Sequence, residues 1–325
     1  MTYGNAKPPG TTSWSGSVTQ LGTEMESYYG RPIIKEPVWK AEIPAYLFTG
    51  GLGGASAVLH AGARLAGNQR LAKTSLYVGA ACDVVSPPLL IADLGRPERC
   101  LNMFRVFKVT SPMSVGSWVL MVSAGASSTA AALRVLGVLK PVKTAAEIIA
   151  AFLGPPLATY TGTLFADTAV PVWHEARQEL PWLFGASASA SAGAAAAVFT
   201  PTEAAGPARR LALIGAAAEL GLMETMKRRL GFVGEVYDQG EAGTYGRISK
   251  VCTAAGAALL ATAGKRSRAA SMGGGALMLA GGLALRWSVF RAGFQSARDP
   301  RYTVIPQRER KEARRGGSAQ ASGSG

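Results

Sequence analysis

The sequence is poor in charge and in cysteine, and each shortage excludes a class of protein. Charged residues make up 17% of the 325 residues, against about 25% in ordinary globular domains, and they are clustered, so long windows carry almost none. Cys82, Cys100 and Cys252 lie far apart and form no CxxC pair, which argues against an iron–sulfur or zinc site on this chain. The first residues, "MTYGNAKPPGTTSWSGSV", lack the apolar core of a signal peptide. Together these features indicate a polytopic membrane protein.

Histidine is scarcer still, with two in the whole chain, His60 and His174. His60 falls near one end of an apolar segment and His174 falls in a loop at the other side of the predicted membrane. Two histidines on opposite sides cannot ligate one iron, so the sequence excludes a bis-histidine haem. No other metal-ligating constellation is present. If the chain handles electrons, a partner must bring them and a small diffusible carrier must take or supply them.

Long apolar segments rich in glycine (40 residues) fill most of the chain, and glycine is more frequent in membrane helices than in soluble ones. A helical span needs about 20 apolar residues. We predict an all-α integral membrane protein, with a polar, extended arm over residues 1–40, a membrane domain over 41–290 and a basic, partly disordered tail over 291–325. The eight predicted transmembrane helices, of which the seventh is short, cover residues 42–64, 71–92, 113–134, 144–166, 180–200, 209–227, 247–264 and 269–290.

Eight spans place both termini on one side of the membrane, which we call the terminal face, together with the loops 93–112, 167–179 and 228–246. The opposite side, the far face, has only short turns. The terminal face carries more Lys and Arg in total, whereas the far-face turns carry them more densely, so the positive-inside rule leaves the orientation open. We attribute the net charge of +14 to these clusters between apolar segments rather than to nucleic-acid binding.

Polar residues inside predicted spans default to functional hypotheses. Five polar groups from four helices fall at similar depth near the terminal face: Glu42, Tyr46, Asp93, Tyr160 and Glu224. The runs "SPP" at 86–88 and "GPP" at 154–156 interrupt helix hydrogen bonding, and freed carbonyls in a membrane must face protein or a cavity. We favour a binding cavity, with interfacial snorkelling as the alternative. The run "GGLGG" at 50–54 favours close helix packing.

A second set of ionisable residues lies deeper. Asp83 is about 15 Å from Asp93 along its helix, near the bilayer centre, and Glu219 has a comparable depth, whereas His60 and Glu147 lie towards the far face. We hypothesise a proton route through these residues. The alternative is that each is hydrogen-bonded to neighbouring backbone, and Arg286 either neutralises one of them or snorkels. The candidates for the proton route are Asp83, Glu219, Glu224, His60 and Glu147.

The stretch "LLIADLGRPERCLNMFRVFKVTSPMSVGSW" at 89–118 resembles the DLGRP, N-x-x-R-V-F-K and SPMS-x-GSW pattern of the NrfD / polysulfide reductase membrane-subunit family. "WKAEIPAYLFTGGLGGA" at 39–55 resembles the first helix of that family, and "YTGTLF" at 160–165 and "LPWLFGASA" at 180–188 resemble its fourth and fifth helices. The resemblance covers residues 39–200 well and is carried further mostly by the number of spans.

The resemblance implies an eight-helix subunit without haem, in two four-helix bundles in the cytoplasmic membrane, that exchanges electrons with menaquinone or ubiquinone. It implies as partners an iron–sulfur subunit and a molybdopterin catalytic subunit, so this chain is not catalytic alone. Tyr46 and Glu42 fall where related subunits place a quinone-contacting His and an Asn. The quinone-site residues that the resemblance implies are Glu42, Tyr46, Asp93, Arg96 and Tyr160, and those expected to contact the partner are Arg99, Arg105 and Lys108.

The implied residue types suit quinone chemistry, which moves two electrons and two protons. A tyrosine hydroxyl can hydrogen-bond a quinone carbonyl, and a carboxylate can pass protons. Two other function classes remain open. A secondary transporter also has broken helices and midplane charges, but residues 41–166 and 180–290 show no convincing internal repeat. A purely structural anchor would bind no quinone. Copurified iron and molybdenum would argue against the transporter, and bound quinone would argue against the structural anchor.

Overall fold

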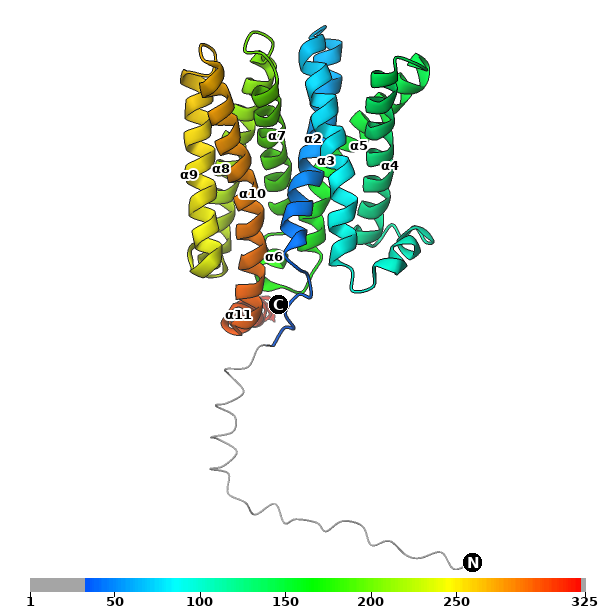
Figure 1. The fold of residues 1–325 in the computed structure, drawn as a ribbon. Coiled ribbons are helices and arrows are strands. Elements are labelled where there is room, and N and C mark those ends of the chain that lie inside the picture. The colour runs from blue at the N-terminus through cyan, green and yellow to red at the C-terminus, as the bar shows by residue number, and fades with distance from the viewer. Residues whose placement is uncertain (1–32, 323–325) are drawn as a thin grey trace, which may run out of the picture.

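The computed structural model describes residues 33–322, and these residues form helices and connections with no β-strand among them. Eight long helices stand side by side in a bundle (Figure 1). Four of them, α3, α4, α5 and α7, are long and apolar enough to cross a membrane. The eight helices are α2 (Glu42–Leu65), α3 (Gln69–Asp93), α4 (Pro112–Leu136), α5 (Lys140–Ala166), α7 (Leu180–Phe199), α8 (Gly206–Leu230), α9 (Gly240–Thr262) and α10 (Arg268–Arg298).

Local sequence explains where several helices begin and end. The Asn68 side chain accepts a hydrogen bond from the backbone N–H of Leu71 (3.1 Å) and so caps the start of α3. Ser267 does the same for α10 through the N–H of Ala270 (3.2 Å). At the other end of α4, Gly137 adopts φ +71°, a left-handed conformation that suits glycine and stops the helix. These signals make the far-face turns short, so consecutive helices lie antiparallel.

Contacts between the helices form two closed rings. In the first half of the chain, α2 packs on α3, α3 on α4, α4 on α5, and α5 back on α2. In the second half, α7, α8, α9 and α10 close a ring in the same order. Helix α2 also contacts α7 and α10, and α5 contacts α7, so the two rings share a buried seam. Any site within one ring is therefore built from four consecutive helices.

The glycine run at residues 50–54 lies where α2 meets α5. A Cβ atom at Gly54 would overlap the carbonyl oxygen of Gly154, and a Cβ atom at Gly154 would overlap that of Gly54. The two backbones therefore touch, which only glycine at both positions permits. This contact confirms close helix packing for the run, and it places α2 in the middle of the molecule.

The remaining elements gather at the terminal face: the short η1 (Pro97–Phe104), α6 (Pro171–Glu175) and η2 (Gly231–Asp238), and the longer α11 (Arg301–Ser322). Figure 1 shows α11 at the same end of the bundle as the chain that enters α2. Trp39 of that entering segment stacks on Phe165 and Trp173, with ring centroids 5.2 and 5.5 Å away. The indole N–H of Trp173 donates to the carbonyl of Val289 (2.7 Å). Residues 1–32 of the predicted arm lie outside the described residues.

The C-terminal segment from residue 291, predicted as a basic, partly disordered tail, contains helical elements. Helix α10 runs past residue 290 to Arg298, and helix α11 follows it. The extension has a packing reason, because Ala292 and Gly293 are buried and Gly293 lies directly against the Trp173 ring. Helix α11 is tied down by an ion pair between Arg310 and Glu175 of α6 (2.8 Å). A basic composition alone does not reveal such anchoring contacts.

Candidate functional site: a tyrosine groove and buried charges

Tyr160 lies near the terminal-face end of α5, with its ring pressed against α4. A Cβ atom at Gly116 of α4 would overlap the Tyr160 ring, so the ring occupies the space that a larger residue would fill. The Tyr160 side chain is 9% exposed. Its hydroxyl is buried and has no hydrogen-bond partner among the described residues. Because burying a hydroxyl without a partner costs about 1–3 kcal/mol, this group is a natural place for a polar ligand atom.

The Tyr160 side chain lines a groove of about 700 Å³ between α4 and α5. The apolar part of the groove comes from helix residues such as Val115, Val119 and Pro156, and its polar part comes from α5 and from loops at the terminal face. Such a combination of apolar walls with a few polar groups is typical of small-molecule sites. The polar lining residues are Thr110, Thr159, Tyr160, Thr163, Asp167, Arg177 and Gln178.

Glu42, Tyr46 and Asp93 lie where α2 begins and α3 ends. Tyr46 is 1% exposed, and Oε2 of Glu42 is buried without a hydrogen-bond partner among the described residues. Asp93 accepts a hydrogen bond from the backbone N–H of Lys40 (2.7 Å), and the Lys40 ammonium donates to the carbonyl of Ala92 (3.2 Å). Asp93 therefore ties the segment before α2 to the end of α3.

The structure connects these predicted residues only in part. Tyr46 and Tyr160 belong to one buried apolar cluster, which also includes Leu90 of α3 and Leu120 of α4. Tyr160 lines the α4–α5 groove, whereas Glu42, Tyr46, Asp93 and Arg96 are not among its lining residues. Arg96 is exposed on the loop after α3. Gly116, Arg177 and Gln178 were missed from the sequence, although "SPMSVGSW" did mark the helix that carries Gly116.

A second, apolar cavity of about 270 Å³ lies on the other side of α4, against α3 and η1. Ser117 lines it, one residue after the glycine that supports Tyr160, so the two spaces flank the same turn of α4. Its size and apolar walls suit part of a hydrocarbon chain. The lining residues are Pro87, Leu90, Ile91, Cys100, Leu101, Met103, Phe104, Ser117, Leu120, Met121 and Ala124.

The charged connector between α3 and α4 is held by aromatic contacts. Phe104 and Phe107 meet the Trp118 ring edge-on, with centroids 5.7 and 6.3 Å away. Three residues of this connector are predicted to contact a partner, and all three are exposed: Arg99, Arg105 and Lys108. The connector therefore presents basic side chains at the terminal face, and beside them it exposes the apolar residues Leu101, Val106, Phe107 and Val109.

Asp83 is fully buried on α3 at the level of the α2 glycine run. Its Oδ2 accepts a hydrogen bond from the Ser127 hydroxyl of α4 (2.6 Å), and its Oδ1 has no hydrogen-bond partner among the described residues. A Cβ atom at Gly53 would overlap the Asp83 carboxylate. Nearer the terminal face, the hydroxyls of Thr49 and Ser86 are 2.8 Å apart. Polar groups thus continue along the α2–α3 interface.

His60 and Glu147 meet near the far face, where α2 contacts α5. Nε2 of His60 is 3.4 Å from Oε1 of Glu147, and both side chains are buried. Lys143 binds the same carboxylate oxygen (3.0 Å), and Arg64 forms an ion pair with the other oxygen. The sequence predicted the depth of His60 and Glu147, and the structure shows in addition that they form one cluster.

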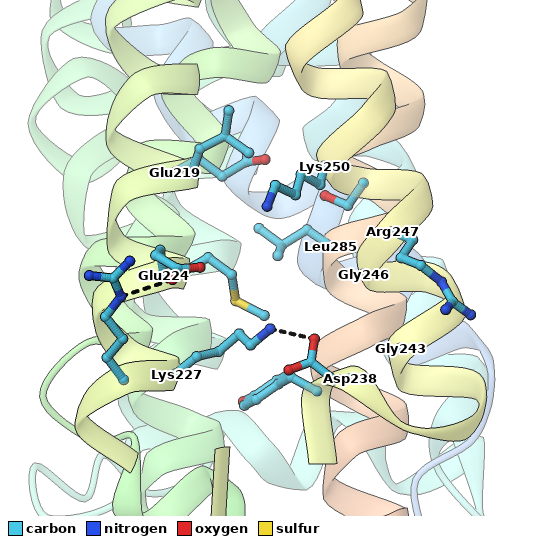
Figure 2. A pocket seen from close by; sticks show the side chains of 14 residues that line it. Glu219, Glu224, Lys227, Asp238, Gly243, Gly246, Arg247, Lys250 and Leu285 are labelled. Atoms are coloured by element: carbon cyan, nitrogen blue, oxygen red, sulfur yellow. Dashed lines mark hydrogen bonds and ion pairs between the residues drawn. The ribbon is translucent and has the colours of Figure 1, made fainter. Parts of the chain in front are cut away.

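Glu219 and Glu224 belong to the second ring of helices. Figure 2 shows a cavity between α8 and α9, of about 470 Å³, with Glu219 at its inner end and the Lys227–Asp238 ion pair near its mouth. Glu219 is buried and accepts a hydrogen bond from the Thr253 hydroxyl (3.1 Å). Glu224 also lines this cavity, but it is exposed and paired with Arg228 (2.9 Å), whereas Glu219 is buried.

Arg286 is a buried cation on α10, in the same ring of helices as Glu219. Its guanidinium lies over the Phe184 ring, 4.0 Å from the centroid, and donates to the Phe184 carbonyl (3.0 Å). The Arg286 side chain is 1% exposed, which argues against snorkelling. In the described part of the chain, no group of three or more His, Cys, Asp or Glu side chains is arranged to hold a metal ion.

The family model described as "Polysulphide reductase, NrfD" matches residues 33–230, which is more than half of the chain and includes the α4–α5 groove, Asp83 and the His60–Glu147 cluster. No curated protein matches the chain.

Proposed function

The chain belongs to the polysulphide reductase NrfD family, and on that premise we propose that it is the quinone-reactive membrane subunit of a redox complex. Family membership and the apolar helices make it a multi-pass membrane protein. In our proposal all eight long helices span the cytoplasmic membrane as two four-helix bundles. The two closed rings of helix contacts support this arrangement.

The observation that carries the proposal is Tyr160, which lines the α4–α5 groove and whose hydroxyl is buried without a hydrogen-bond partner among the described residues. A tyrosine hydroxyl can donate a hydrogen bond to a quinone carbonyl, and that bond strengthens as the oxygen gains negative charge on reduction. Polar residues line part of the groove, and its apolar walls, which include Val115, Val119 and Pro156, suit the start of the isoprenoid tail. We therefore place the quinone head beside Tyr160.

The proposed partners follow from the same placement. An iron–sulfur subunit at the terminal face would lie next to the groove, with Arg99, Arg105 and Lys108 meeting acidic groups on its surface. Electrons would pass between its clusters and the quinone, and a molybdopterin subunit would carry the catalytic site. The chain itself would supply no haem and no cluster, because its role is to bind the quinone and to handle protons.

Protons must accompany the electrons, since quinone reduction consumes two. Glu42 and Asp93 lie at the terminal-face ends of α2 and α3, and we propose them as proton donors to the quinone. We propose the buried Tyr46 and the exposed Arg96 as further residues of the quinone site. Asp83, His60, Glu147, Glu219 and Glu224 remain the proposed proton route, although the pairing of Glu224 with Arg228 makes it the weakest member.

Two conservative substitutions test the site. Tyr160→Phe removes the hydroxyl without changing the ring, and Glu42→Gln removes a proton donor with little change in shape. Each is expected to lower quinone-coupled turnover about tenfold or more, which corresponds to about 1.4 kcal/mol, while the complex still assembles with its full iron content. Normal quinol kinetics in both variants would contradict the proposed pocket.

A further inference from the structure

The orientation of the His60 ring determines where its proton lies. Nδ1 of His60 is 2.7 Å from the carbonyl oxygen of Ala72, at the start of α3. A carbonyl oxygen can only accept a hydrogen bond, so Nδ1 must carry a hydrogen. In the neutral ring the other nitrogen, Nε2, then has a lone pair and no hydrogen. The ring is 2% exposed, so bulk water does not satisfy this lone pair.

The group that Nε2 faces is another acceptor. Oε1 of Glu147 is 3.4 Å away, and an ionised carboxylate can only accept hydrogen bonds. Nε2 has no hydrogen-bond partner among the described residues. Two acceptors that face each other inside a protein repel, and one added proton turns the contact into a charge-assisted hydrogen bond. The pair therefore has a built-in binding site for one proton.

Groups from α2, α3, α4 and α5 determine how readily this site binds a proton. Arg64 of α2 and Lys143 of α5 both bind Glu147, and Arg134 of α4 adds a positive potential at the ring. From α3 the ring receives the Ala72 carbonyl. Lys143 shares Oε1 with the ring, so it competes with a protonated His60 for the same oxygen. Its side chain is 17% exposed and that of Arg64 is 37% exposed, so the cluster reaches solvent at the far face.

We propose that His60 and Glu147 form a proton-exchange site at the far face, gated by Lys143. When the Lys143 ammonium leaves Oε1 for water, a proton from the far-face solution binds Nε2 and the new Nε2–H bond donates to Oε1. When Lys143 returns, its ammonium replaces that hydrogen bond and the Nε2 proton is released. No electron is transferred in this step, and the ring and the carboxylate keep their positions.

Two buried hydroxyls lie between this site and Asp83. Ser56 lies one turn from His60 on α2, and Ser75 lies one turn from Ala72 on α3; both are buried with hydroxyls that no described protein group satisfies. A Cβ atom at Gly79, one turn before Asp83 on α3, would lie 3.4 Å from the Ser56 Cβ. Hydroxyls both donate and accept, so they can pass a proton between imidazole and carboxyl. That the route serves a quinone rests on the proposed function, whereas the proton site itself does not.

The proton site can be tested on the full chain in lipid nanodiscs, without any activity. His174→Gln leaves His60 as the only histidine, so ¹⁵N-histidine NMR reports this ring alone. We expect Nδ1 to stay protonated at all pH values and Nε2 to gain a proton as the pH falls. Glu147→Gln should move the midpoint of that protonation to lower pH by about one unit or more, because an opposite charge within hydrogen-bond reach is lost. Lys143→Gln should move it to higher pH.

A neutral ring with its hydrogen on Nε2 would overturn the proposal, as would a midpoint that neither variant moves. Arg308→Gln, an exposed change on α11 at the terminal face, is the control for nonspecific charge effects. A second experiment tests the link to the interior in proteoliposomes that hold the complete complex. His60→Gln should lower the number of protons exchanged at the far face per electron transferred, and an unchanged number would overturn the link. Absence of quinone turnover in the unmodified complex would contradict the proposed function and leave the NMR result standing.

Discussion

Tyr160 and Tyr46 show how the surroundings of a residue decide its role. Both belong to the same apolar cluster and both are deeply buried. Tyr160, however, borders a groove with polar residues at its mouth, and its hydroxyl has no protein partner among the described residues. A buried hydroxyl without a partner is costly, so the fold keeps Tyr160 at the expense of stability. We read that cost as the mark of a ligand contact.

Gly116 gives a sharp test of the Tyr160 position. In Gly116→Ala the new methyl group would overlap the ring, so the ring must move away from α4. Because positioning errors of about 1 Å can cost on the order of a hundredfold in rate, we expect turnover with quinol to fall tenfold or more. Steady-state quinol kinetics on the purified complex measure the effect.

The matched control is Gly125→Ala on the same helix. A Cβ atom there would meet no atom within 4 Å, and Ala is a better helix former than Gly, so this variant should assemble and turn over normally. If the two alanine variants behaved alike, the Tyr160 position would not matter for the reaction.

Among the elements, the segment before α2 is held to the bundle by an exposed ion pair and an aromatic stack, in addition to the hydrogen bonds of Lys40 with the end of α3. Oε1 and Oε2 of Glu36 accept hydrogen bonds from Nε (2.9 Å) and Nη2 (3.0 Å) of Arg298 at the end of α10. Trp39 then stacks on Phe165 and Trp173. The segment thus joins the first ring of helices to the last helix of the second ring, at the face where we place the iron–sulfur partner.

This anchoring should depend on pH. The hydrogen bond from Arg298 lowers the pKa of Glu36 from its usual 4.5. The ion pair therefore contributes fully above pH 4.5, and its contribution is lost as the pH falls through the lowered pKa. We expect deuterium uptake by residues 33–40, corrected for intrinsic exchange, to rise as the pH falls below 4.5 and through the lowered pKa of Glu36. Arg298→Gln should raise it already at pH 7.

Arg301→Gln serves as the control for this experiment, because Arg301 pairs with Asp299 of its own turn and not with the segment before α2. It should leave the uptake of residues 33–40 unchanged. Equal uptake in the Arg298 variant and the unmodified protein would show that the aromatic stack holds the segment without the ion pair.

At the scale of the whole molecule, hydropathy determined the helix positions well. Each predicted apolar segment overlaps one of the eight long helices, because a long apolar stretch between charged clusters has few other conformations in a membrane. The glycine run at 50–54 also predicted close packing correctly, because a helix face without large side chains lets a neighbouring backbone approach closely. The C-terminal helix was missed, because its anchoring depends on contacts with α6 that no local pattern reveals.

The sequence predicts how deep in the bundle each residue of the candidate site lies, but not which neighbouring helix its side chain faces. A residue's distance from the helix end gives its depth in the bundle, and that reasoning placed His60 with Glu147 and Asp83 near the middle. Which helix face points to which neighbour depends on packing. For this reason the sequence grouped Glu224 with Tyr160, whereas the structure places Glu224 on an exposed face paired with Arg228.

The most direct test of the central claim is electron exchange between quinone and the clusters of the iron–sulfur partner. The complex is purified through a tag on this chain, its clusters are reduced chemically, and electron paramagnetic resonance follows their oxidation after a quinone analogue is added. Our account predicts that the cluster signal is lost on the timescale of turnover, and about tenfold or more slowly in Tyr160→Phe. Clusters that stay reduced in a complete complex with added quinone, or a chain that purifies without iron, would contradict it.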